Sequence, residues 1–206
     1  GGIIAPAMTR GDEVVVNGWS PSNRDGKFAN SGFVVQVDQK DWKPFDLKGE
    51  HQALSAMRFQ ASIEKVAFEK GGSNLSAPAQ TIKDFVSRKD SIRLPECSYI
   101  PGIVPANMEG VLPPKFSHSI REALRYFGKR MPGFVSHDSV LVGVESRTSS
   151  PVRIPRDRES LEHPQIKGLY PCGEGAGYAG GIMSAAVDGI RVAQAISTKQ
   201  SSSFKK

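Results

Sequence analysis

The sequence predicts a mixed fold of the α/β or α+β class. Short runs of β-branched residues occur before and after a stretch whose apolar residues recur at helical spacing, and one further helical pattern closes the chain. This order of strands, helices, strands and a last helix differs from that of a repeat protein, and no internal repeat is visible. A packed domain with strands and helices interleaved is therefore expected.

The strands are predicted from runs that are rich in β-branched residues. Glu13 to Val16 is the first such run and Gly32 to Val37 the second, and a polar loop marked by glycine joins them from Asn17 to Gly26. Ser139 to Val144 is a later strand. Ile166 to Cys172 is a short strand that breaks into a glycine-dense turn.

The helices are predicted from the spacing of apolar residues. One helix runs from Gln52 to Lys70, where Gly71 and Gly72 stop it. A shorter helix is expected over residues 79–86, after Pro78. Another begins near Ser117, with Ser117 or Ser119 as its N-cap, and ends near Gly128.

Composition narrows the class of protein. The chain has 206 residues, 38% of them hydrophobic, which is enough for one or two domains with a core. No apolar run approaches the ~20 residues that span a bilayer, so a soluble protein is expected. Cys97 and Cys172 lie far apart and not in CxxC spacing, which argues against a disulfide framework or a zinc site and favours a reducing compartment.

The charge of the chain is positive, with 27 Lys and Arg against 21 Asp and Glu, or a net charge of +6. Such an excess attracts nucleic acid or anionic lipid when it is clustered. Here the cations are scattered, and the group between Lys115 and Arg130 is expected to be the solvated face of a helix. An anionic cofactor would also benefit from the excess.

The segment from Gly173 to Gly181 carries the clearest chemical signal. It is dense in glycine, so its backbone amides can approach a ligand where a Cβ would obstruct it. A helix follows from Ile182 to about Ile196, and its first unpaired N–H groups and positive dipole end favour a negative oxygen. Glycines before a helix can also form a purely structural turn, and no βαβ unit follows that would make this a GxGxxG fingerprint.

Glu174 favours a cofactor-binding turn over a purely structural one. A carboxylate directly after a strand and a glycine can accept hydrogen bonds from ribityl or ribose hydroxyls while the next amides contact phosphate or the flavin ring. This combination suits FAD better than ATP, because the chain has no GK[ST] sequence.

The run GLYPCGEGAGYAGGIMSAAVDGI (168–190) resembles the terminal motif of a family of uncharacterised FAD-dependent dehydrogenases from bacteria and plant plastids, within the two-domain flavoproteins related to glutathione reductase. The resemblance extends to VESRTSSPVRI (144–154), to CSYIPG (97–102), and to NGWS (17–20) with Arg24-Asp25 and residues 29–31. It covers most of the chain. The terminal motif and the ESRTSSPVR run are specific, whereas the middle of the chain matches loosely.

This resemblance implies an α/β architecture that is the C-terminal part of a FAD/NAD(P)-binding flavoprotein fold with an inserted α+β substrate-side domain. Residues 1–32 would return to the FAD-binding domain, 33–137 would form the insert, 138–198 would close the FAD-binding domain, and 199–206 would be a disordered tail. The family's opening GxGxxG unit is missing from the sequence. We therefore expect a C-terminal fragment that lacks this half and is inactive alone, in agreement with its start at Gly1 rather than at a Met.

The resemblance also implies a set of cofactor-binding residues. Gly173, Glu174 and Gly175 would meet the ribityl and pyrophosphate part of FAD, and the amides of Gly180, Gly181 and Ile182 would face the pyrimidine edge of its flavin ring. The dipole of the following helix favours negative charge on that ring. No metal site is expected.

Three residues are candidates for catalysis. Arg147 and Ser149 lie on a hydroxyl-rich turn that follows a strand and could reach an anionic substrate or the flavin, or could only fix the loop. Tyr178 lies among the glycines and could contact the flavin, gate the substrate or pack in the turn. The four histidines show neither ligand spacing nor a Ser or Asp partner.

The sequence thus predicts an FAD-dependent oxidoreductase that transfers a hydride between flavin and a small-molecule substrate. The guanidinium groups of Arg147 and Arg153 suggest that this substrate is anionic. NAD(P)H is an expected electron donor, the missing N-terminal part of the protein is an expected partner, and a membrane is not. The location would be the cytoplasm, or the plastid stroma in a plant. Two alternatives stay open: a non-catalytic binding or assembly protein with the same fold, and a flavoprotein that acts on RNA.

Overall fold

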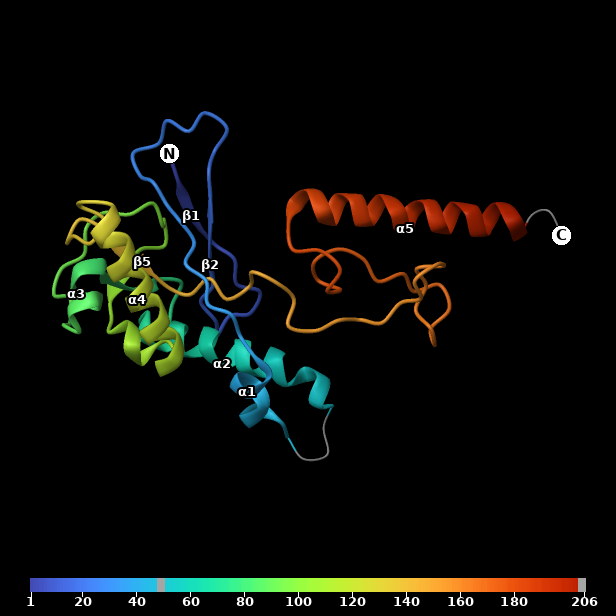
Figure 1. Ribbon diagram of the computed structural model, residues 1–206, viewed down its shortest axis with the longest axis horizontal. Coiled ribbons are helices and arrows are strands. Elements are labelled where there is room, and N and C mark those ends of the chain that lie inside the picture. The colour runs from blue at the N-terminus through green and yellow to red at the C-terminus, as the bar shows by residue number, and fades with distance from the viewer. Residues whose placement is uncertain (48–50, 204–206) are drawn as a thin grey trace. The chain divides into compact units, whose positions relative to one another are not determined.

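The structure, a computed structural model, describes residues 1–47 and 51–203. The chain forms two compact units (Figure 1). The first unit comprises Gly1–Trp42 and Arg58–Ser146, and the second comprises Lys43–Met57 and Arg147–Lys206.

The first unit contains two small sheets. An antiparallel pair, β1 (Ile3–Pro6) and β2 (Val16–Trp19), aligns Ile3 with Trp19 and Pro6 with Val16. A three-stranded sheet has β3 (Ala77–Thr81) at its centre, parallel to β4 (Ile103–Pro105) and antiparallel to β5 (Val140–Val142). Every residue of β3 is buried, as expected of a central strand that is covered on both faces.

Helices complete the first unit, and one of them begins in the second. Their bounds are α1 (Gln39–Trp42), α2 (Ser55–Lys70), α3 (Ile82–Ser87), the 3₁₀ turn η3 (Met108–Gly110) and α4 (Pro114–Arg130). Thr81 caps α3, because its side chain accepts a hydrogen bond from the N–H of Asp84. The short α3 and the long α4 pack together.

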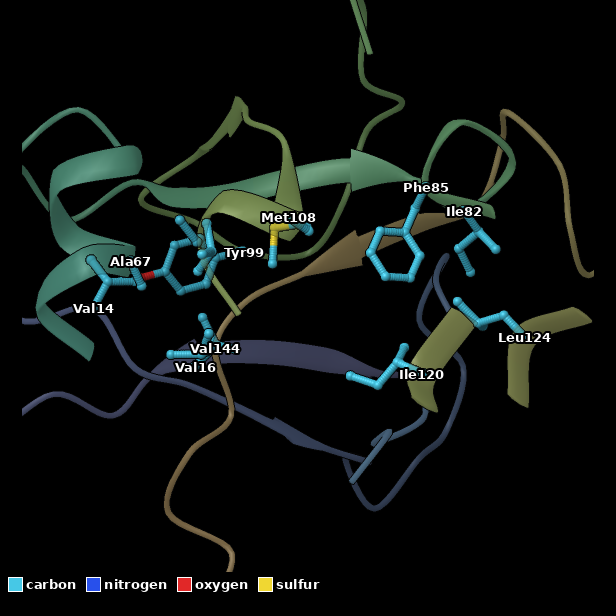
Figure 2. Packing of buried hydrophobic residues seen from close by; sticks show 12 residues of the cluster. Val14, Val16, Ala67, Ile82, Phe85, Tyr99, Met108, Ile120, Leu124 and Val144 are labelled. Atoms are coloured by element: carbon cyan, nitrogen blue, oxygen red, sulfur yellow. The ribbon is translucent and has the colours of Figure 1, made fainter. Parts of the chain in front are cut away.

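The core of the first unit lies between the central sheet and these helices (Figure 2). Phe85 and Ile82 of α3 lie beside Leu124 of α4, and Tyr99 lies toward Ala67 of α2. The cluster comprises Val14, Val16, Ala67, Ala77, Ile82, Phe85, Tyr99, Met108, Val111, Ile120, Leu124 and Val144. Segments far apart in sequence therefore share one apolar interior, which is the main stabilising contribution in a unit of this size.

The second unit has little regular structure before its last helix. Two 3₁₀ turns, η1 (Lys43–Phe45) and η2 (Gln52–Leu54), precede α2, and turns and irregular chain occupy residues 147–181. Helix α5 (Ile182–Ser203) follows.

Several predicted elements are confirmed. The predicted helix 52–70 is α2 with one 3₁₀ turn before it, and Gly71 and Gly72 end it, the latter at φ +95°. The predicted strand 139–144 contains β5. The helix predicted after the glycine turn is α5, which begins at Ile182. A mixed α/β fold with small sheets agrees with the predicted class.

The predicted strands near the N-terminus are partly wrong. Val14 and Val15 are buried, yet the paired strand β2 begins only at Val16 and takes in the first residues of the predicted loop 17–26. Gly32 to Val37 is not a strand, although Phe33 and Val35 pack on the core while Val34 is exposed. Alternation fixes the directions in which side chains point, but a strand also needs a neighbour for its hydrogen bonds, and no described segment pairs here.

Two predicted helices also need correction. The predicted helix 79–86 is in fact the end of β3 followed, after Thr81, by α3. The strand was missed because a fully buried strand shows no alternation of apolar and polar residues, and because Pro78 is unusual within a central strand. Helix α4 begins at Pro114, and neither Ser117 nor Ser119 is its N-cap. Both hydroxyls instead donate to carbonyls of preceding residues. Pro113-Pro114 is the start signal, since proline suits the first helical turn.

The C-terminal region differs in two details. The predicted strand 166–172 is a series of turns, with Gly168 at φ +80°. Helix α5 continues to Ser203, past residue 199, where the predicted tail begins. Residues 204–206 of that tail lie outside the described residues. No helix in the described part of the chain combines the length and apolar character that crossing a membrane requires.

The predicted domain boundaries stay predictions. The boundaries at residues 32 and 137 both fall inside the first unit, whereas the compact units meet at residues 42, 57 and 146. Compactness measures contacts within this chain, and the predicted boundaries refer to domains of a longer flavoprotein.

Phe85→Ala should destabilise the first unit by about 3 to 5 kcal/mol, because it empties a fully buried ring site between α3 and α4. Urea unfolding followed by tryptophan fluorescence measures the loss. Ile100→Ala is the matched control, since Ile100 is 93% exposed and its truncation should change the free energy of unfolding by less than about 0.5 kcal/mol. Equal effects of the two changes would contradict the described core.

Candidate functional site

All of the site residues predicted from the sequence lie in the second unit. They are Arg147, Ser149, Gly173, Glu174, Gly175, Tyr178, Gly180, Gly181 and Ile182. The described contacts join the glycine turn at 173–178 to the start of α5 and to the segment 150–156. All of these contacts lie within the second unit.

The glycine turn is closed by two backbone hydrogen bonds. The N–H of Gly177 donates to the carbonyl of Glu174 at 2.8 Å, and the N–H of Tyr178 donates to that of Gly173 at 3.0 Å. Gly173 and Gly177 have φ values of +72° and +82°, a region that favours glycine. A Cβ on Gly177 would also lie 2.7 Å from the carbonyl oxygen of Val152. These two glycines are thus required by the fold of the turn.

Other glycines in the segment are not required by the described chain. A Cβ on Gly175 or Gly180 would meet no atom within 4 Å, and one on Gly181 would make only ordinary contact with Ser184. None of the three has a positive φ. They therefore leave backbone open at the surface, where another molecule can approach closely.

An ion pair anchors the turn to α5. Arg156 donates from both terminal nitrogens to the Asp188 carboxylate at 2.9 and 2.6 Å, and also to the carbonyl of Pro171. Asp188 in turn accepts the N–H of Gly173 at 2.9 Å. Both charged side chains are about nine-tenths buried. A buried pair of this kind fixes geometry because each charge needs the other.

The electrostatics follow from that geometry. The hydrogen bond from Arg156 is the main cause that lowers the pKa of Asp188, and the amide of Gly173 adds to it against the effect of burial. The same bond raises the pKa of Arg156. The pair was missed in the sequence, although a single carboxylate among Ala185, Ala186 and Gly189 on an otherwise small and apolar helix was a usable signal.

The segment 150–156 runs along the glycine turn. The Ser150 hydroxyl donates to the carbonyl of Gly175 at 3.2 Å, and the N–H of Ile154 donates to that of Ala176 at 3.2 Å. The Tyr178 hydroxyl donates back to the carbonyl of Ile154 at 2.9 Å. The SSPVR run and the glycine turn therefore contact each other within the second unit.

The residues that make this contact differ from those chosen for catalysis. Ser150, Arg153 and Arg156 contact the turn or Tyr178, whereas the exposed Ser149 and the half-buried Arg147 are not among the contacts described for it. The guanidinium carbons of Arg153 and Arg156 lie 4.3 and 3.6 Å from the centroid of the Tyr178 ring. Two guanidinium groups thus make cation–π contacts with the ring of Tyr178.

The start of α5 presents free donors. Gly181 donates to the hydroxyl of Ser184, and the N–H of Ala185 donates to Gly181, but the described residues provide no acceptor for the N–H groups of Gly180, Ile182 and Met183. No donor of the described chain reaches the half-buried Glu174 carboxylate. Donors and an acceptor beside open glycines suit a hydroxylated, negatively charged ligand. No group of three His, Cys, Asp or Glu in the described chain could hold a metal ion.

Gly177→Ala should destabilise the second unit by about 1 to 3 kcal/mol, because alanine is strained at φ +82° and its Cβ would approach the carbonyl of Val152. Gly175→Ala is the control and should leave stability nearly unchanged, since open space surrounds that position. Urea unfolding followed by far-UV circular dichroism, to which α5 contributes together with the helices of the first unit, measures both. A larger loss of stability for Gly175→Ala than for Gly177→Ala would contradict the conclusion that the turn requires Gly177 and does not require Gly175.

The Asp188 pair should make the second unit sensitive to acid. Because the pKa of Asp188 is lower in the folded chain, its stabilising contribution is fully present above the unfolded-state pKa, about 4, and is lost as the pH falls through the lower folded-state value. Asp188→Asn should lower stability at pH 7 and weaken its pH dependence below about 4. Asp25→Asn, on an exposed loop, is the control, and an unaltered pH profile in Asp188→Asn would contradict the assignment.

Comparison with known proteins identifies a family that is described as FAD-dependent. A family model described as "FAD-dependent protein, C-terminal domain-like" matches residues 1–148. An uncharacterized protein of Clostridium beijerinckii is 42% identical over 201 residues, which cover 97% of this chain and 36% of that protein. The chain thus spans little more than a third of the relative's length. Because the family model covers most of the chain, the protein belongs to the family of FAD-dependent proteins with this C-terminal domain.

Proposed function

We propose that the chain supplies the flavin-ring side of an FAD-dependent oxidoreductase of the glutathione-reductase-like type. Family membership supports a flavoprotein-related role. The observation that carries the finer proposal is the combination of open glycines at 175 and 180 with unpaired N–H groups at the start of α5. The substrate would be a small organic molecule, with NAD(P)H as an electron donor.

The residues of the second unit fit FAD by their chemistry. Amides at Gly180 and Ile182 would donate to the electronegative edge of the ring, aided by the dipole of a helix of 22 residues. The free Glu174 carboxylate would accept hydrogen bonds from ribityl or ribose hydroxyls. When bound, FAD would supply the hydride chemistry itself, and the protein would supply position and electrostatics.

Arg156 and Asp188 would position the residues that bind the cofactor and would not contact it themselves. Their pair sets where Gly173 lies relative to α5, so it would hold the donors and the Glu174 acceptor in one fixed arrangement. Tyr178 would form a rigid wall beside the cofactor, because its ring and hydroxyl are both held. Arg147 and Ser149 remain proposals as catalytic groups.

The outer face of α5 supports a site completed by further polypeptide. Ile182, Met183, Val187 and Ile190 are 90%, 75%, 44% and 58% exposed, which is unusual for large apolar side chains on one helix. The relative from Clostridium beijerinckii has 64% of its length outside the match. We propose that the GxGxxG part of the same protein, which would bind the pyrophosphate, covers this face.

Glu174→Ala in the full-length protein should lower the amount of bound FAD several-fold, because the ribityl or ribose hydroxyls would lose their acceptor. The ratio of flavin to protein absorbance after gel filtration measures retention. Glu159→Ala removes a carboxylate from an exposed turn of the same unit and serves as control. Equal flavin content in both variants and the wild type would rule out this role for Glu174.

A further inference from the structure

Arg153 carries a charge that the second unit does not neutralise. Its side chain is exposed, and no carboxylate of the described residues forms an ion pair with it. Its neighbour Arg156 differs, since both terminal nitrogens of that residue are committed to Asp188. Arg153 therefore retains the full donor capacity of its guanidinium fork.

A second guanidinium group shares the Tyr178 ring with Arg153. Arg153 and Arg156 both lie over Tyr178, and Arg191 acts electrostatically on Asp188. An anion that reaches this surface would meet attraction that the described residues leave uncompensated.

Arg153 is also held in position before any ligand binds. Its Cα and Cβ pack against Gly177, where an added Cβ would lie 3.1 Å from each. Its guanidinium lies over the ring of Tyr178, whose hydroxyl is bonded to Ile154. The base of the side chain and its guanidinium group thus both contact residues of the glycine turn. Because the side chain is already ordered, it loses less entropy when the guanidinium binds an oxyanion.

We propose that Arg153 is the residue that recognises the substrate's anionic group, a carboxylate or a phosphate, beside the flavin. This inference rests on the proposed function and deepens it, because it names the substrate class of the same site. The sequence pointed to two guanidinium groups for this task, those of Arg147 and Arg153, and named Arg147 as the catalytic candidate. Arg153 is better placed, since it lies over Tyr178 and its backbone contacts the glycine turn.

The test uses flavin-loaded full-length protein and calorimetric titration with inorganic phosphate and with malonate. Wild type should bind one of the two anions, and Arg153→Ala should raise its Kd about tenfold or more. Arg153→Lys should fall between them, because lysine keeps the charge and loses the fork. Arg158→Ala, which removes an exposed arginine from the neighbouring turn, should match wild type.

The outcomes separate the two proposals. If neither anion binds wild type, or if Arg153→Ala binds as tightly as Arg158→Ala, the inference is wrong. The proposed function would still stand in that case, provided that the purified protein contains bound flavin. Loss of flavin in Arg153→Ala would show that the arginine serves the cofactor's phosphate, which also overturns the inference. A folded but colourless wild-type protein would refute the proposed function, and the inference with it.

Discussion

The pair between Arg156 and Asp188 is the constraint on which the candidate site depends. One carboxylate on α5 accepts a two-pronged hydrogen bond from Arg156 and a third bond from the amide of Gly173, so it joins the helix, the glycine turn and the segment 150–156. Little regular structure surrounds it. Without this pair, the second unit would have few other described bonds that fix the turn relative to the first residues of α5.

The same constraint explains how a loop-rich unit can present an ordered surface. Required glycines at 173 and 177 shape the turn, and open glycines at 175 and 180 expose its backbone. Tyr178 lies across the turn under two guanidinium groups. The first unit, which carries the family match, is stabilised differently, through an apolar core around β3. The chain thus combines a conventionally packed unit with one whose order depends on polar anchors.

The sequence predicted features that local chemistry controls and missed those that depend on distant partners. Helix α2 and the start of α5 follow from apolar spacing and flanking glycines. The strand β3 was hidden because Pro78 and full burial removed its usual pattern, and residues 32–37 showed alternation without a neighbouring strand. In the site, the glycines and Tyr178 could be named from sequence, whereas the pairing of Arg156 with Asp188, 32 residues apart, appears only when the chain folds.

The proposed function requires that this chain form part of a working flavin site. The most direct measurement is the visible absorbance spectrum of the purified full-length protein, before and after anaerobic addition of dithionite and after return to air. A working flavin site should give a flavin band that bleaches on reduction and recovers with oxygen. A correctly folded full-length protein with no flavin band, even after incubation with excess FAD, would contradict it.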